Sequence, residues 1–186
     1  MKVFFLISLL LGISWATLVG RYYKALHRGD SLEEIRRHVA GEMKSFNSAV
    51  TLAFYAEEAM SKGRLDVVEM LIRDFNLDPR QPAPFRGGLS VPRSLVCAAA
   101  CRGHLKALQM FTYVLWKRGH SIPDDVLPNL LVEKAIYIDV LEHLIDVGID
   151  FNQAIRKGVP VLKLAKLYQD KEILSMIETA IQQQMV

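Results

Sequence analysis

Two stretches of the chain read alike: GRLDVVEMLI at residues 63–72 and GHLKALQMF at residues 103–111. Each opens with a glycine and continues with apolar residues three and four positions apart, a spacing that places them along one side of a helix. A glycine at the start is typical of a tight turn, because glycine readily adopts the left-handed conformation that ends a preceding helix. Both stretches therefore predict the second helix of a helix–turn–helix pair.

Related helix pairs recur along the chain at a nearly constant spacing. The second helix of each pair carries an aligned apolar residue, and successive ones are 33, 40, 33 and 33 residues apart. These markers are Ile35, Val68, Leu108, Leu141 and Leu174. The residues nine positions before them, expected to lie where the two helices of a pair approach, are Leu26, Ala59, Ala99, Val132 and Ala165. A period near 33 residues is typical of stacked helical repeats, so the sequence predicts an all-α repeat solenoid.

The repeats resemble ankyrin repeats. AACRGH at residues 99–104 and GIDFN at residues 148–152 are similar to the family's helix turn and to the turn after its second helix. The resemblance covers roughly residues 21–183, as four repeats after a shorter N-terminal one at residues 22–39. The family's Thr-Pro-Leu-His opening is replaced throughout, which leaves the repeat boundaries open, together with a different solenoid of helix pairs. Membership would imply a module that recognises a protein partner.

The first twenty residues form a separate segment. Residues 3–20 are 18 positions without a charge, and a helix of that length spans about 27 Å, close to the thickness of a bilayer's hydrocarbon core. One interpretation is a membrane anchor, with the basic residues that follow, such as Arg21 and Lys24, holding the rest of the chain in the cytoplasm. The other is a signal peptide cleaved after Ala16, which would leave a secreted or periplasmic protein. Residues 21–186 are then the repeat domain.

The single step of 40 residues indicates an insertion between the second and third pairs. The extra residues fall within residues 76–93, where four prolines and a pair of glycines favour an extended loop over a helix. Insertions in repeat proteins often lie on the binding face, although Phe85 in this loop has the alternative role of packing the loop against the array. The candidate partner-binding residues are Arg80, Phe85 and Arg86 in the loop, and Trp116 and Lys117 on the lengthened second helix of the third repeat.

Motifs that would indicate chemistry have simpler structural interpretations. GDSL at residues 29–32 spells the nucleophile motif of a lipase-like hydrolase family, but it lies between two predicted helices, where Ser31 or Asp30 would cap the second one. Cys97, Cys101 and His104 share one helical face and have the spacing of metal ligands, yet the cysteines are expected to pack as small apolar side chains. We therefore expect no catalytic residue, no metal site and no cofactor.

The composition excludes several classes of protein. The 23 Lys and Arg against 20 Asp and Glu give a net charge of +3, which provides no electrostatic case for nucleic-acid binding. A hydrophobic content of 51% excludes a disordered chain, and two cysteines cannot form a disulfide scaffold. The expected function is a non-enzymatic protein–protein interaction module, either a membrane-anchored adaptor or an accessory subunit of a membrane complex. An exported inhibitor or immunity-type binder is the alternative, and no small-molecule substrate is expected.

Overall fold

The computed structural model describes residues 20–45, 49–83, 93–132, 136–156, 158, 161–166 and 170–184. Within these residues the chain is mostly helical, and its described strands are two segments of two residues each. The chain divides into two compact units, one ending at Leu77 and the other beginning at Asp78. The predicted all-α class is confirmed.

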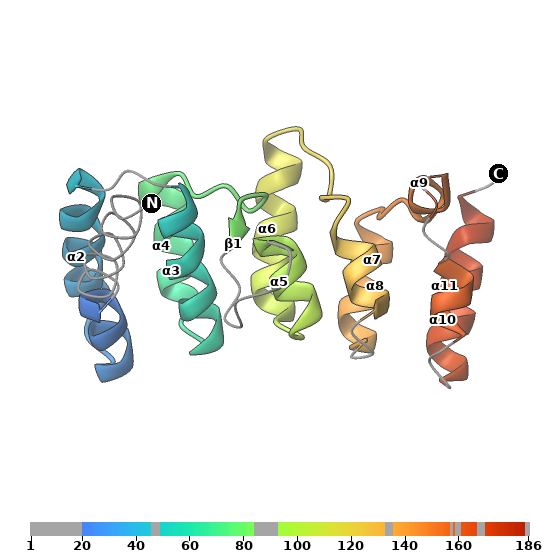
Figure 1. Cartoon of the computed structure of the whole chain (residues 1–186), viewed down its shortest axis with the longest axis horizontal. Coiled ribbons are helices and arrows are strands. Elements are labelled where there is room, and N and C mark those ends of the chain that lie inside the picture. The colour runs from blue at the N-terminus through green and yellow to red at the C-terminus, as the bar shows by residue number, and fades with distance from the viewer. Residues whose placement is uncertain are drawn as a thin grey trace, which may run out of the picture. The chain divides into compact units, whose positions relative to one another are not determined.

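The first unit consists of helices joined by short connections (Figure 1). Residues 20–28 are helical, and α2 (Leu32–Ser45), α3 (Ala49–Ser61) and α4 (Leu65–Phe75) follow. Helix α4 contacts both α2 and α3. Fully buried apolar side chains from each of these helices form the core, among them Tyr22, Ile35, Tyr55, Val68 and Leu71.

The second unit begins with two short strands at the ends of the predicted insertion. Strand β1 (Pro82–Ala83) pairs with the antiparallel strand β2 (Arg93–Ser94). Residues 84–92 lie outside the described part of the chain. The helices that follow are α5 (Leu95–Cys101), α6 (Leu105–Lys117), α7 (Val126–Val132), α8 (Ile138–Asp146), α9 (Phe151–Arg156), α10 (Val161–Ala165) and α11 (Lys171–Gln183).

The helices of the second unit pack in two rows. In one row α5 contacts α7 and α7 contacts α10, and in the other α6 contacts α8 and α8 contacts α11. The rows are joined because α5 also packs on α6, and α10 on α11. Figure 1 shows these pairs following one another along the second unit. Between the helices of the second row, Leu108, Phe111, Leu141 and Leu144 are fully buried.

Glycines end the helices where the sequence predicts turns. Gly63, Gly103 and Gly148 have φ values of +67°, +70° and +79°. After each of them, the next amide donates a 2.9 Å hydrogen bond to the carbonyl five residues earlier. This bond satisfies a carbonyl that the end of the helix would leave unpaired. Gly29 and Gly119 form turns of the same kind.

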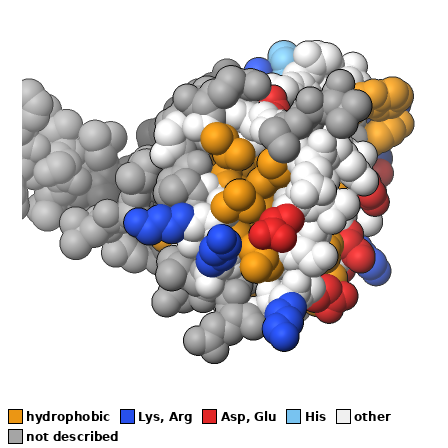
Figure 2. All heavy atoms as spheres, turned by 90° about the vertical axis from the view of Figure 1, so that its right-hand side faces the viewer, with side chains coloured by type: hydrophobic (Ala, Val, Ile, Leu, Met, Phe, Trp, Pro, Cys, Tyr) orange, Lys and Arg blue, Asp and Glu red, His pale blue; other side chains and the backbone are white. Residues whose placement is uncertain are grey.

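The predicted spacing of the second helices is confirmed. They begin at Leu32, Leu65, Leu105, Ile138 and Lys171, with the same separations as the five markers. Four markers are fully buried, but Leu174 is half-buried. Among the described helices α11 is the last of its row. Its one described neighbour in that row is α8. Figure 2 faces this end of the chain and shows hydrophobic side chains gathered between charged ones.

The alignment of the first helices is wrong at one position. Val132 is 60% exposed, whereas the preceding Leu130 and Leu131 are buried. The connection from α7 to α8 is longer than the glycine turn from α5 to α6. The offset of nine residues that holds between Ala99 and Leu108 therefore does not carry over to this pair.

The predicted anchor or signal segment, residues 1–20, lies outside the described residues except for Gly20. No helix in the described part of the chain is both long enough and apolar enough to cross a membrane.

Candidate functional site

A groove of about 560 Å³ lies on the second unit between α6 and α8. One wall is the face of α6 that carries Tyr113 and Trp116, and the other is the end of α8 with Asp146 and Val147. The loop after α6, including His120, closes one end. All of these residues belong to one compact unit, which holds the two walls together.

Helix α6 exposes two aromatic side chains on its wall of the groove. Helix α6 has 13 residues, against 9 in α8, the next helix of the same row. Its buried side chains include Leu108, Phe111 and Leu115, which lie three and four positions apart and face the core. Tyr113 and Trp116 fall on the other side of the helix and are 53% and 73% exposed. Helix α6 is thus longer than α8 but no longer than α11, which also has 13 residues, and Trp116 lies near the end of α6.

Tyr113, Trp116 and Lys117 form an aromatic cluster on the surface of α6. The ring centroids of Tyr113 and Trp116 are 6.0 Å apart, and the Lys117 ammonium lies 4.8 Å from the centroid of the Tyr113 ring. The negative face of a tyrosine ring attracts a cation at this distance. Tyr113 therefore holds both neighbours in place. The sequence analysis missed Tyr113, although its position one turn before Trp116 and Lys117 was the available signal.

A histidine lies against α6 inside the groove. The Nε2 atom of His143 is 2.9 Å from the Thr112 hydroxyl oxygen, which also lies 3.0 Å from the Leu108 carbonyl. This hydrogen bond joins α6 to α8, and the Thr112 hydroxyl also lies 3.1 Å from the Gln109 carbonyl. Burial lowers the pKa of His143, and the carboxylate of Asp146 partly opposes this effect. Burial inside the groove therefore disfavours the charged form of this ring.

The exposed ridge of α8 beside the groove is acidic. Glu142 and Asp146 are both exposed and lie one helical turn apart. A second groove, of about 460 Å³, runs along the other side of α8 toward α11, and Asp146 lines both grooves. Among the described residues neither Glu142 nor Asp146 takes part in an ion pair. The ridge of α8 between the two hollows thus presents negative charge to solvent.

Arg80, the candidate contact of the long loop that the structure describes, does not line this groove. The Arg80 guanidinium is exposed and bonds to the Asp78 carboxylate at 2.7 Å. That hydrogen bond is the main cause that lowers the pKa of Asp78, and the nearby charge of Arg118 adds to it. Phe85 and Arg86 lie outside the described residues. Of the five predicted contacts, Trp116 lines the groove, and Lys117 lies beside it over the Tyr113 ring.

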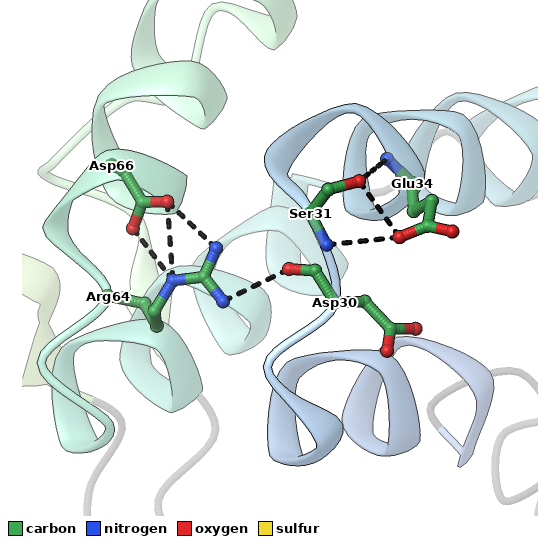
Figure 3. A network of polar contacts seen from close by, with 5 residues as sticks. All are labelled: Asp30, Ser31, Glu34, Arg64 and Asp66. Carbon is green, nitrogen blue, oxygen red and sulfur yellow. Dashed lines mark hydrogen bonds and ion pairs between the residues drawn. The ribbon is translucent and has the colours of Figure 1, made fainter.

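The GDSL serine caps a helix, as predicted. The Ser31 hydroxyl lies 2.8 Å from the Glu34 carboxylate, and the amide of Glu34 donates to the Ser31 oxygen at 3.3 Å (Figure 3). The Ser31 amide in turn donates to the same carboxylate at 3.1 Å. These bonds lower the pKa of Glu34 and form the reciprocal box that satisfies the first amides of α2. Figure 3 also shows the Asp30 carbonyl accepting a bond from Arg64.

The cysteine pair is buried in α5. The two cysteines form no disulfide with each other, because their sulfur atoms lie 3.8 Å apart, well beyond the ~2.05 Å of a disulfide bond. The contact with Cys101 and burial both raise the pKa of the Cys97 thiol. The pair therefore packs as small apolar side chains, as expected. Within the described residues no group of three or more histidine, cysteine or acidic side chains is arranged to hold a metal ion.

Comparison of the chain with models of known protein families, with curated proteins and with solved structures finds no match.

A buried carboxylate lies in the first unit. Glu42 is 7% exposed, and the Tyr55 hydroxyl donates a hydrogen bond to its Oε2 atom. The other oxygen, Oε1, has no hydrogen-bond partner in the described part of the chain. Burial raises the pKa of Glu42, while the Tyr55 hydrogen bond and the charges of His38 and Arg21 oppose the rise. Folding therefore favours the protonated carboxyl.

Glu42 is expected to make stability fall as pH rises. Because the raised pKa means that the folded state binds this proton more tightly, the free energy of unfolding declines from glutamate's ordinary pKa of 4.5 through the raised value. In Glu42→Gln, which stays neutral, this decline should be absent. Urea unfolding of both proteins below, within and above this pH window measures the difference. Glu69→Gln, which changes an exposed glutamate of α4, is the control, and an identical pH profile for both variants would refute the assignment.

Proposed function

We propose that the chain is an ankyrin-like array of helix pairs that binds a protein partner through the groove between α6 and α8. The observation that carries this proposal is Trp116, which is 73% exposed at the groove beside the 53% exposed Tyr113. Large aromatic side chains dominate the binding energy of many protein interfaces. Two of them on one short stretch of helix, facing a hollow, form a surface that a partner would cover.

Three features support the array. Within the second unit, successive pairs contact one another helix by helix in two rows, and along the chain the second helices begin at the predicted spacing. The glycine turns share one hydrogen-bond pattern. Hydrogen bonds also join residues close to one period apart: 33 residues separate Tyr22 from Tyr55, and 31 separate Thr112 from His143. Stacked repeats have this organisation, since each repeat contacts only its neighbours.

The groove suits a protein partner because aromatic side chains lie at its centre and polar ones at its border. Its aromatic wall on α6 is bordered by exposed polar side chains such as Gln109 and Asp146. An apolar centre with a polar, solvent-accessible border is the usual arrangement of protein interfaces. The contacts among Tyr113, Trp116 and Lys117 hold the rings before binding, so binding has less side-chain entropy to overcome.

The uncharged residues 3–20 support a further part of this proposal, attachment of the module to a membrane. The module would then act as an adaptor or as an accessory subunit of a membrane complex. Cleavage after Ala16 would instead release an exported binder, and the groove would serve either protein in the same way.

Photocrosslinking in cells that make the full chain tests the binding site. A photoreactive amino acid in place of Gln109, which is exposed and lines the groove, is expected to crosslink a discrete protein. Adding Trp116→Ala should reduce that yield at least about tenfold, because truncating a central aromatic costs about 2 kcal/mol or more. Trp116→Phe should keep most of it.

The matched control is the same photoreactive residue in place of Lys106. Lys106 is exposed on the same helix but does not line the groove. Equal crosslinking from positions 106 and 109 would contradict the proposal. A yield at position 109 that survives Trp116→Ala, with an unchanged melting temperature, would contradict it as well.

A further inference from the structure

The charge of α8 differs from that of the rest of the groove. Its sequence, IDVLEHLID, contains three acidic residues and no Lys or Arg. Asp139, Glu142 and Asp146 follow one another at intervals of three and four residues and are all exposed, so they lie along one face. His143 is the single basic side chain of this helix, and burial lowers its pKa. Across the groove, Lys117 lies over the Tyr113 ring, so the negative charge is confined to the α8 side.

Five carboxylates of the described chain have basic partners, whereas some exposed ones, such as Glu69 and Glu172, form no ion pair. Arg28 pairs with Asp30, and Arg80 pairs with Asp78, each at 2.7 Å. Glu142 and Asp146, by contrast, form no ion pair with any described residue. Charges arranged in this way attract a partner of opposite sign and fix its register more than they add affinity. The partner side of this interface is therefore expected to be basic.

The two hollows beside α8 suit a helix. Both walls of the larger groove are helices, and a third helix packs between two others by setting its ridges of side chains into the groove between them. Glu142 and Asp146 lie four residues apart on α8, and two side chains four residues apart on a partner helix are separated by the same distance. Asp146 lines both hollows, whereas Glu142 lines only the smaller one. A partner helix along the larger groove would thus bring one basic side chain to Asp146 at its edge and a second one over the exposed ridge of α8 to Glu142.

We propose that the groove receives a basic amphipathic helix of another protein. Its apolar face lies against Tyr113, Trp116 and Val147, and Lys or Arg side chains four residues apart on its flank pair with Glu142 and Asp146. This inference rests on the proposed function and adds the chemistry of the partner to it.

Selection from a displayed library of random peptides tests the inference. The full chain is the target, and peptides that also bind Trp116→Ala are removed. The remaining peptides are expected to carry apolar residues at helical spacing, with Lys or Arg three and four positions apart beside them. Glu142→Gln with Asp146→Asn should weaken the best peptide about threefold to tenfold, the effect of two exposed charge pairs, and added salt should reduce that difference.

The control is Glu172→Gln with Glu178→Gln, which neutralises two exposed acids of α11 that line neither groove, and it should leave the affinity unchanged. A chain with Glu142→Lys and Asp146→Lys should select acidic peptides instead. Trp116-dependent peptides without an excess of basic residues would overturn the inference and leave the proposed site in place. If no selected peptide depends on Trp116, the proposed site itself fails.

Discussion

Replacing Phe111 with alanine is expected to lower the free energy of unfolding by about 3–5 kcal/mol, because it removes a large buried side chain and leaves a cavity. Phe111 is fully buried on α6, and α6 packs against both α5 and α8. The surrounding helices cannot close around the lost ring without shifting. Urea unfolding of the full chain, followed by far-UV circular dichroism, measures the loss.

Tyr113→Ala is the matched control for Phe111→Ala. It removes an aromatic ring from the same helix, but that ring is 53% exposed, and surface substitutions usually change stability by about 0.5 kcal/mol or less. The control should still reduce crosslinking from position 109. A loss of stability as large as that of Phe111→Ala would mean that Tyr113 supports the fold, and the aromatic cluster would no longer serve as a binding surface.

Asp125→Ala is expected to cost about 2–4 kcal/mol, since hydrogen bonds to a charged group contribute about 1.5–3 kcal/mol each and do not add fully. The Asp125 carboxylate accepts bonds from the amide and the hydroxyl of Ser94, at 2.7 Å and 2.8 Å. Ser94 is 6% exposed and caps α5 through the amide of Cys97. The substitution would leave buried donors at the start of α5 without an acceptor, and urea unfolding measures the cost.

Two further variants separate the Asp125 hydrogen bonds from general effects of the substitution. Asp125→Asn keeps one acceptor oxygen and should lose about half as much stability. Combining Asp125→Ala with Ser94→Ala should cost clearly less than the sum of the two single changes, because they remove the same contact. Strict additivity would show that the contact between α5 and the start of α7 does not stabilise the protein.

Much of the helical pattern could be predicted because it depends on local interactions. Apolar residues three and four positions apart defined the buried side of α4 and α6 whatever lay opposite. Gly63 and Gly103 ended their helices because few other residues tolerate a positive φ. Ser31 and Glu34, three residues apart, form a box that needs no distant partner.

The first helices were harder to align, because the connections between helices vary in length. Val132 was placed by an offset measured in other pairs, and it is exposed because the α7–α8 connection is longer. Leu174 is aligned correctly within α11, yet it is only half-buried, because burial depends on which helices pack against α11. Neither the path of a connection nor the presence of a neighbour is encoded in the apolar pattern of one helix.

The candidate site could be predicted only in part. Trp116 and Lys117 stood out because an aromatic and a basic residue close a long helix. Arg80 forms an ion pair with Asp78, and its role in binding stays a prediction. The acidic wall is opposite the aromatic one because α6 packs beside α8, whose residues follow about thirty positions later.

Helix spacing, glycine turns and caps therefore follow from the order of the residues, since each depends on neighbours within a few positions. The groove, its half-buried His143 and the acidic ridge of α8 beside it follow from packing between helices, which sets the distances and the burial that no single segment contains.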